Sequence, residues 1–316
     1  MKKVFLSALI AFASLTASAQ MNGGSFGFGG QQQQIDLPIS EKFIDVNYAD
    51  DGQAYHNLDI YLPKEKKESY PVVIHIYGSA WFSNNSKGMA DLGTIVNALL
   101  KAGYAVVCPN HRSSQDALYP AQINDIKAVI RFVRGNAKKY HFDTNFIATS
   151  GFSSGGHLAT LAATTSNCKE FKVEETVYDL EGNVGNYTNE SSSVNAACDW
   201  SGPIDLMHMD CSGPPKMQFS PEEAIMGKSL KTDLQYFAAL SATTFVDKND
   251  PPVIILHGTD DSVVPFCQSE ILNNVLTEAG VKHEYVPVQG GNHGFNGMYD
   301  QPNLDKMINF LNDLRK

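Results

Sequence analysis

A serine between glycines is the feature that most constrains how this chain can fold. Residues 151–155 are Gly-Phe-Ser-Ser-Gly; the apolar run 145–150 precedes them and a helix-forming stretch, 156–163, follows. Strand, Gly-x-Ser-x-Gly and helix in this order predict a sharp turn that holds its central serine, Ser153, in a strained backbone. Only residues without side chains let strand and helix pass so closely. We therefore interpret Ser153 as a nucleophile; a glycine-rich turn without chemistry is the alternative.

An acid and a histidine follow this serine. A serine nucleophile needs a base and a group that orients the base, in the chain order serine, acid, histidine for a strand–turn–helix serine. The apolar run 252–256 leads into a polar turn with Asp260 and Asp261, and the run 283–288 leads into a glycine loop with His293. All three groups thus follow predicted strands, which favours a catalytic triad.

Spacing leaves two choices open. Asp260 and Asp261 are neighbours, and Ser153 differs from Ser154 only in being the centre of the Gly-x-Ser-x-Gly pattern. The non-catalytic interpretations are a turn-capping carboxylate for Asp260 and a loop histidine bonded to backbone for His293.

A hydrolase of this kind also needs donors for the negative charge that develops on the substrate carbonyl oxygen. The β-branched run 72–77 ends in the small residues Gly78, Ser79 and Ala80, whose backbone amides are candidates. The amide of Ser154, directly after the nucleophile, is the second candidate arm. A plain loop at a strand end is the alternative.

These segments together resemble the α/β-hydrolase esterases, in particular the bacterial feruloyl- and acetyl-xylan-esterase-like group related to hormone-sensitive-lipase-type carboxylesterases. The resemblance covers the chain from about Phe43 to the C-terminus. It rests on motifs that occur in family order, at residues 77–81, 120–134, 151–159, 257–265 and 291–295. The acid loop has the pattern His-Gly-x-x-Asp-x-x-Val-Pro, which selects Asp261 as the acid.

The sequence departs from the family pattern at three places. Tyr77 stands where the family has a histidine, Ser79 replaces a glycine, and His111-Arg112 stands where a Tyr-Arg pair is common. Backbone donors do not depend on side chains, so the amides are expected to survive these changes. Serine tolerates a positive φ poorly, so the conformation of the loop at Ser79 is open.

Alternating strand-like and helix-like segments predict an α/β-hydrolase fold: a doubly wound, mostly parallel sheet with an antiparallel N-terminal strand pair and a small lid insertion. Helical spacing occurs at Ile123, Ile126, Ile130 and Val133 and again at Leu304, Met307, Ile308 and Leu311, which we interpret as core packing. The predicted strands are residues 43–48 and 58–62 as the antiparallel pair, then 72–77, 105–109, 146–150, 196–200, 253–257 and 284–288.

Two long segments, 166–195 and 207–245, interrupt the alternation. Loops of this length are often functional in a compact domain. The resemblance implies that the second segment lies over the site as a partial lid. Four side chains are candidates for an acyl or sugar pocket, with core packing as the alternative for each: Trp81, Phe82, Met209 and Met217.

The N-terminus has the pattern of a signal peptide. Lys2 and Lys3 precede an apolar stretch of about a dozen residues that ends at Ala17-Ser18-Ala19. We predict a signal peptide over residues 1–19, a flexible Gly/Gln-rich leader over 20–36 and an α/β-hydrolase domain over 37–316. The protein is therefore expected to be exported to the periplasm or the cell exterior. With no cysteine at the cleavage site, no lipid or membrane anchor is expected.

The net charge argues against polyanionic partners. The formal net charge is −10, and removal of the signal peptide, which holds two lysines and no acidic residue, makes it −12. Without a basic patch, nucleic acid and anionic membranes are not expected partners.

The five cysteines form an odd set, so at least one thiol is expected to be unpaired. Cys198 and Cys211 flank a strand end and its loop, so their pairing is one hypothesis, and the sequence leaves the pairing of the five cysteines open. Residues 208–211, His-Met-Asp-Cys, carry metal-ligand types, but neighbours in a loop seldom converge on one ion. We therefore predict no metal and no organic cofactor.

The resulting hypothesis is an exported serine carboxylic-ester hydrolase that acts through Ser153, His293 and Asp261. By resemblance, its substrate is a small ester, or an acetyl or feruloyl ester on a plant polysaccharide such as xylan. Two alternatives stay open: a serine peptidase of the prolyl-oligopeptidase or dipeptidyl-peptidase type, and a non-catalytic binding protein on the same fold. Such peptidases usually carry a β-propeller, for which this chain has no room.

Overall fold

The computed structural model describes residues 35–89, 91–213 and 219–315. Its contacts divide the chain into two units, Met1–Asp36 and Leu37–Lys316. The predicted signal peptide and nearly all of the predicted leader lie outside the described residues. Everything below concerns the described part of the second unit.

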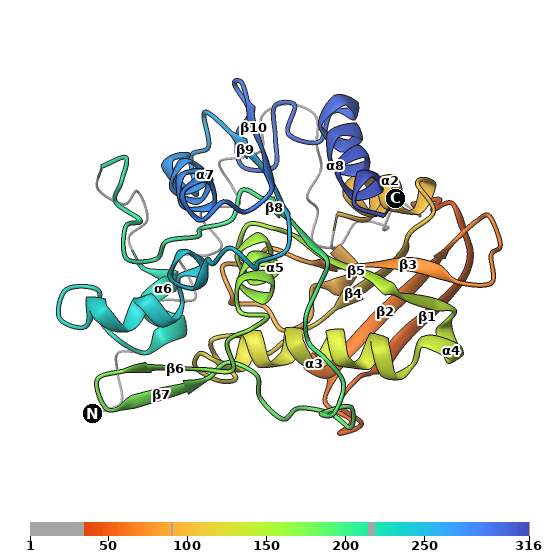
Figure 1. Cartoon of the computed structure of the whole chain (residues 1–316), viewed down its shortest axis with the longest axis horizontal. Helices are drawn as coiled ribbons and strands as arrows, with labels where there is room; N and C mark the ends of the chain where they lie inside the picture. Colours follow the sequence, from red (N-terminus) through yellow and green to blue (C-terminus); the bar gives the residue numbers. More distant parts are fainter. Residues whose placement is uncertain (1–34, 90, 214–218, 316) are drawn as a thin grey trace, which may run out of the picture. The chain divides into compact units, whose positions relative to one another are not determined.

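An eight-stranded sheet forms the centre of this unit, with the strand order β1-β2-β4-β3-β5-β8-β9-β10 (Figure 1). The β1–β2 and β2–β4 pairs are antiparallel, and every later pair is parallel. The predicted mostly parallel sheet with an antiparallel N-terminal pair is therefore confirmed. The strands are β1 (Ile39–Asn47), β2 (Asn57–Pro63), β3 (Tyr70–Ile76), β4 (Ala105–Pro109), β5 (Phe142–Phe152), β8 (Ala196–Trp200), β9 (Val253–Gly258) and β10 (His283–Val288).

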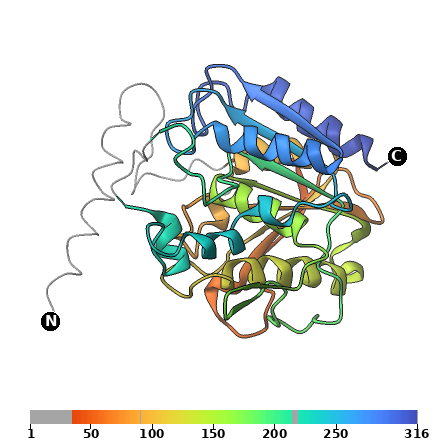
Figure 2. The same ribbon diagram turned by 60° about the vertical axis from the view of Figure 1, so that its left-hand side comes forward.

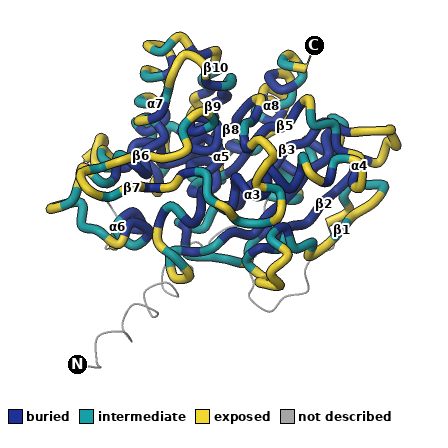
Figure 3. The backbone as a smooth tube through the Cα atoms, turned by 60° about the horizontal axis from the view of Figure 1, so that its bottom comes forward, coloured by how far each residue is buried: buried dark blue, intermediate teal, exposed yellow. Residues whose placement is uncertain are grey.

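The central strands are buried on both faces, as β3 illustrates. Val72 and Ile74 point into one apolar cluster, whereas Val73 between them points into the other, because side chains alternate along a strand. Figure 3 shows the central strands as buried, whereas several residues of the edge strand β1 are exposed. Two buried faces require a layer of helices on each side.

Helices supply these two layers (Figures 1 and 2). Buried residues of α3, α5 and α7 belong to one apolar cluster, and those of α2 and α8 belong to the other. The residues predicted at helical spacing in α3 are all buried, and in α8 only Ile308 is half-buried. The helices are α2 (Asn97–Lys101), α3 (Ala121–Gly135), α4 (Ala137–Tyr140), α5 (Ser154–Thr164), α6 (Pro221–Met226), α7 (Cys267–Ala279) and α8 (Gln301–Asp313).

Shorter helical turns occur in the loops. Four are 3-10 turns and one is a π-helical turn that leads directly into α2. They are η1 (Ala54–His56), η2 (Lys87–Met89), η3 (Leu92–Val96, the π-helical turn), η4 (Leu234–Ala239) and η5 (Ala242–Phe245).

The first interrupting segment contains a small hairpin, β6 (Glu170–Val173) with β7 (Thr176–Asp179). Charged contacts fasten the segment to α3: Arg131 pairs with Glu181, and Lys127 Nζ lies 3.4 Å from the same carboxylate. Burial lowers the pKa of Lys127 below its usual value. The hairpin in turn contacts the second segment, because Glu174 accepts hydrogen bonds from Gln235 and Tyr236.

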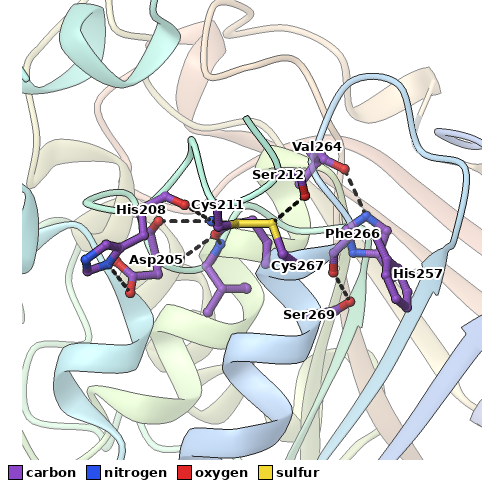
Figure 4. Close-up of a disulfide and its surroundings, with 11 residues drawn as sticks. Asp205, His208, Cys211, Ser212, His257, Val264, Phe266, Cys267 and Ser269 are labelled. Atoms are coloured by element: carbon purple, nitrogen blue, oxygen red, sulfur yellow. Dashed lines mark hydrogen bonds and ion pairs between the residues drawn. A yellow bond between two sulfur atoms is a disulfide. The ribbon is translucent and has the colours of Figure 1, made fainter. Parts of the chain in front are cut away.

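The second interrupting segment is cross-linked to α7 by a disulfide between Cys211 and Cys267 (Figure 4). The hypothesis that Cys198 and Cys211 pair is therefore wrong. Cys198 is a free, buried residue of β8 whose side chain packs in the cluster under α2 and α8, away from this segment. Cys108 and Cys168 are also free, which agrees with the prediction of unpaired thiols.

No helix within the described ranges is long and apolar enough to cross a membrane.

Candidate active site

Ser153 occupies the turn between β5 and α5, with φ 57° and ψ −125°. This conformation is rare for a residue with a side chain and marks stored strain. A side chain on Gly155 would overlap the backbone of Ile76 and Tyr77, and one on Gly151 would overlap the backbone of Gly155. The glycines of the motif are thus required by close backbone approach, and the Ser153 side chain lies at the carboxyl end of the sheet.

His293 and Asp261 lie beside this serine. His293 Nε2 is 3.0 Å from Ser153 Oγ, and His293 Nδ1 is 2.8 Å from Asp261 Oδ2. The carboxyl ends of parallel strands meet at one edge of a sheet, so the loops after β5, β9 and β10 bring the three groups together. Because Nδ1 faces a carboxylate it carries the hydrogen, which leaves Nε2 to accept the hydrogen of Ser153 Oγ.

The structure separates the two neighbouring aspartates. Asp260 is exposed and its carboxylate accepts a hydrogen bond from the Thr259 hydroxyl, whereas the Asp261 side chain is fully buried. Asp261 Oδ1 accepts hydrogen bonds from the amides of Val263 and Val264 at 2.8 and 2.9 Å. Asp261, rather than Asp260, is therefore the carboxylate that contacts His293.

The ionised form of Asp261 is favoured. Burial alone raises the pKa of this carboxyl group, but the interactions with His257 and His293 outweigh burial and hold the pKa well below its usual value. The carboxylate next to His293 is thus negatively charged throughout the neutral range.

Two residues that the sequence analysis did not single out help to hold the site. Asn292 Oδ1 accepts hydrogen bonds from the amide and hydroxyl of Ser262 and from the amide of His293, at 2.7–3.0 Å. It thereby joins the histidine loop to the acid loop. The ring of Phe152 lies 4.6 Å from the His293 ring. Both residues lie inside motifs of the resemblance, each directly before Ser153 or His293, and no other sequence pattern marks them.

The loop after β3 packs directly against the serine turn. A side chain on Gly78 would come within 2.7 Å of the Phe152 carbonyl and 2.8 Å of Ser153 Cβ. The Ser79 amide donates a hydrogen bond of 2.9 Å to Ser154 Oγ. The Ser79 amide, one of the predicted oxyanion donors, therefore already donates its hydrogen to Ser154.

The other predicted donors are not engaged in this way. In the described part of the chain, the N–H groups of Gly78, Ala80 and Ser154 have no hydrogen-bond acceptor. The positive φ that we considered at Ser79 occurs instead at Ala80 and Trp81, with φ values of 50° and 60°. Strained backbone at a ligand-facing loop is typical of functional sites.

Two of the departures from the family pattern are in contact with each other. The rings of Tyr77 and His111 are stacked, with centroids 4.9 Å apart and an interplanar angle of 11°. Tyr77 Oη also donates to the Ser83 carbonyl, at 2.9 Å. A tyrosine where the family has histidine is therefore matched by a histidine where it has tyrosine.

A cavity of about 810 Å³ lies between the second interrupting segment and the acid loop. Its lining includes Met209, Phe219, Asp260 and Asp261, but neither Ser153 nor His293. The segment thus borders the acid side of the site.

The four predicted pocket side chains have different positions. Met209 lines the cavity, and Phe82 contacts the cavity residue Phe219, with ring centroids 5.9 Å apart. Trp81 is 1 % exposed and packs edge-on against His157, so it belongs to the core. Met217 lies outside the described residues.

The His-Met-Asp-Cys sequence at 208–211 has no free thiol, because Cys211 is bonded to Cys267, and His208 Nδ1 lies 2.9 Å from Asp205 Oδ2. Across the ranges that the structure describes, no group of three or more histidine, cysteine, aspartate or glutamate side chains is arranged to hold a metal ion.

Comparison with known proteins places this chain in a family. Residues 58–276 match the BD-FAE family model. A solved structure described as a truncated form of carbohydrate esterase from gut microbiota is 46% identical, with a TM-score of 0.84, and the match covers 88% of this chain and 97% of that one. A bifunctional GH43-CE protein of Bacteroides eggerthii is 47% identical with a TM-score of 0.83, over 87% of this chain and 35% of that protein.

A curated relative is more distant. A probable carboxylic ester hydrolase of Mycobacterium tuberculosis, LipM, is 29% identical over 227 residues, which are 71% of this chain and 49% of the relative. The chain thus spans about half the length of this curated relative. The family match covers more than half of the chain, and the fold agrees with it: the protein belongs to the BD-FAE family of α/β-hydrolase esterases.

Proposed function

We propose that this protein is a serine carboxylic-ester hydrolase that works through an acyl-enzyme. The observation that carries the proposal is the hydrogen-bonded relay from Ser153 Oγ to His293 Nε2, at 3.0 Å, and from His293 Nδ1 to Asp261 Oδ2, at 2.8 Å. Distances of this size allow proton transfer between the serine hydroxyl and the imidazole without prior rearrangement.

The chemical steps follow from these positions. Ser153 Oγ attacks the ester carbonyl while His293 Nε2 takes the hydroxyl proton. The imidazolium is stabilised by ionised Asp261 and then gives its proton to the leaving alcohol. A water molecule enters, His293 removes its proton and the hydroxide attacks the acyl carbon. The bond from the acyl carbon to Ser153 Oγ then breaks, and His293 returns the proton to Oγ, which releases the acid and restores Ser153.

The amides of Ala80 and Ser154 are proposed to hold the negative oxygen of the tetrahedral intermediate. Both N–H groups are without an acceptor within the described residues, and the Ser79–Ser154 hydrogen bond fixes the two loops against each other. Loss of one such donor typically slows an enzyme by about 100- to 1000-fold.

For the substrate, we propose an ester on a carbohydrate, with an acetyl or feruloyl ester of a plant polysaccharide such as xylan as the specific candidate. The support is the likeness, at 46–47% identity, to two proteins whose descriptions name a carbohydrate esterase or a GH43-CE combination. The cavity between the second interrupting segment and the acid loop offers room for part of a bulky alcohol.

The test is hydrolysis of p-nitrophenyl acetate, acetylated xylan and methyl ferulate by the protein and by Ser153→Ala. We expect loss of the nucleophile to lower kcat by about a millionfold. Ser69→Ala is the matched control, because Ser69 is exposed in the loop between β2 and β3; it should retain full activity.

The same assay separates the alternatives. An active Ser153→Ala variant would refute the triad. Turnover of matched amides in preference to esters would favour the peptidase, and failure of a fluorophosphonate probe to label folded protein would favour a non-catalytic binding protein. Release of acetate from xylan, without release of ferulate, would define the acyl group.

We also propose that the protein is exported. The support is the N-terminal pattern together with the Cys211–Cys267 disulfide, because disulfides persist in oxidising compartments.

A further inference from the structure

The Asp261 carboxylate faces two histidines. Its Oδ2 atom is 2.8 Å from His293 Nδ1 and 3.2 Å from His257 Nε2. His257 lies in β9, before the loop that carries Asp261, and its side chain is fully buried. One histidine thus lies on the serine side of the carboxylate, and the other is buried within the protein.

The surroundings of His257 determine where its hydrogen lies. Nε2 is 3.1 Å from the Val264 carbonyl oxygen as well as 3.2 Å from Asp261 Oδ2 (Figure 4 shows the Val264 contact). A ring nitrogen that faces two oxygen acceptors must carry a hydrogen. Nδ1 is buried and has no partner among the described residues. A second hydrogen there would be an unsatisfied buried donor, so the geometry favours a neutral ring with its hydrogen on Nε2.

Packing keeps this ring in place. Phe266 lies edge-on against His257, with centroids 5.6 Å apart and an interplanar angle of 81°. The residue after Phe266 is Cys267, which is bonded to Cys211, so the chain that holds the aromatic ring is itself cross-linked (Figure 4). His257 therefore presents its Nε2–H from a rigid position.

The charged groups around His257 come from the acid loop, the histidine loop and strand β8. The acid loop contributes Asp261, with His293 beyond it. The neighbouring strand β8 contributes Asp199, which interacts electrostatically with His257 and whose pKa is raised by burial.

We propose that His257 is a positioning residue for the hydrolytic reaction. Its Nε2–H, which donates to the Val264 carbonyl and also faces Asp261 Oδ2, keeps Oδ2 directed at His293 Nδ1 and stabilises the ionised carboxylate. His257 does not contact substrate or the serine in this role; it acts through Asp261. The inference rests on the proposed triad mechanism.

Loss of the His257 donor has a defined consequence. The pKa of Asp261 is lowered by His257 and His293, so removal of His257 raises it. The carboxylate also gains freedom to turn away from His293. The freed carboxylate weakens the active arrangement, so kcat falls, and the acid limb of the kcat/KM profile, which the coupled Asp261–His293 pair sets, is displaced. KM stays nearly constant because no substrate contact is lost.

A pair of amide substitutions tests this role. Glutamine can place an N–H near the position of Nε2, whereas asparagine is too short to reach Asp261. We expect His257→Asn to lower kcat by about 10- to 100-fold, the value of a hydrogen bond to a charged group, and His257→Gln to recover most of the loss. His283→Gln is the matched control, because His283 lies at the start of β10 and bonds the Val281 carbonyl.

Rates are expressed per site titrated with a fluorophosphonate, so that unfolded protein does not count, and thermal unfolding is measured in parallel. The proposal is overturned if His257→Asn keeps the kcat and pH profile of the wild type. It is also overturned if both variants lose activity equally with an unshifted acid limb, which is the behaviour of a purely structural residue. An inactive wild type or an active Ser153→Ala would instead refute the mechanism itself, so the two failures are distinguishable.

Discussion

Asp199 is a buried carboxyl group directly behind the serine turn. Its Oδ1 atom accepts a hydrogen bond from the Gly202 amide at 2.9 Å, whereas Oδ2 is buried without a partner among the described residues. Burial raises the pKa of Asp199 to about 7, against the lowering effects of His257 and the Gly202 amide. The folded protein therefore binds a proton here at pH values at which the unfolded chain does not.

This difference predicts how stability depends on pH. Between pH 3.8 and about 7 the folded state holds the proton and the unfolded state does not, so stability falls as the pH rises and levels off above pH 7. Asp199→Asn imitates the protonated form and should abolish this part of the slope. The full effect is about 4 kcal/mol, at about 1.4 kcal/mol for each pKa unit. We expect the variant to gain stability relative to the wild type between pH 5 and pH 8, measured by urea unfolding.

Asp305→Asn, on the exposed face of α8, is the control and should change the slope little. Asp250, whose pKa is also raised to about 7 by burial, contributes equally to the wild type and to Asp199→Asn. The difference between those two proteins therefore isolates Asp199. Parallel stability curves for them would contradict the assignment.

At the scale of elements, the disulfide and Gln268 attach the second interrupting segment to α7. Gln268 is fully buried; its Oε1 accepts hydrogen bonds from the amides of Ile204 and Asp205, and its Nε2 donates to the His208 carbonyl. Cys211–Cys267 adds a covalent link beyond these hydrogen bonds. Both the Gln268 hydrogen bonds and the disulfide thus attach the start of the segment to α7, next to the acid loop.

Removal of the covalent link should loosen the segment without unfolding the sheet. We expect Cys211→Ser/Cys267→Ser to lower the free energy of unfolding by about 2–4 kcal/mol, which is typical for a disulfide. The Gln268 hydrogen bonds remain, so the loosened part should begin after His208, and limited proteolysis there should become faster. Cys168→Ser, which removes a free thiol, is the control. Unchanged unfolding and unchanged proteolysis would contradict this role.

The elements that sequence could and could not predict differ in physical terms. Continuous apolar runs predicted the central strands, because a strand that is covered by helices on both faces has apolar side chains along its whole length. The β6–β7 hairpin was missed because its strands are short and of mixed polarity, and because Glu174, with φ 51°, takes a turn position that glycine usually marks. The Cys211–Cys267 pair joins residues 56 positions apart, which only the folded chain brings together.

Across the whole molecule, the contact of Ser153, His293 and Asp261 was predictable because their order along the chain follows the order of strands β5, β9 and β10, whose carboxyl ends meet at one edge. The same argument did not find His257, because a buried strand residue has no loop position to mark it as functional. The argument also did not find the Tyr77–His111 stack. Each residue departs from the family pattern, and only the folded structure shows that the two rings contact each other. Sequence order predicts which strand ends carry the chemistry, whereas contacts decide which neighbours support it.

Export, the remaining prediction, is a property of the whole chain. If residues 1–19 direct export, the full-length chain expressed in a Gram-negative host should be recovered outside the cytosol with Gln20 as its first residue. A chain without residues 1–19 should stay in the cytosol and serve as the control. N-terminal sequencing of both fractions provides the measurement.

The cysteines give an independent readout of the same event. The exported protein should contain three titratable thiols after denaturation without reductant, Cys108, Cys168 and Cys198, because Cys211 and Cys267 are bonded. The cytosolic control should contain all five cysteines as thiols, since reducing compartments keep cysteines reduced. A full-length protein that keeps Met1 and five thiols would contradict export. Three thiols together with a Gln20 terminus would support export by two independent measurements. The signal peptide would direct the protein to an oxidising compartment, and the disulfide beside the acid loop can form only in such a compartment.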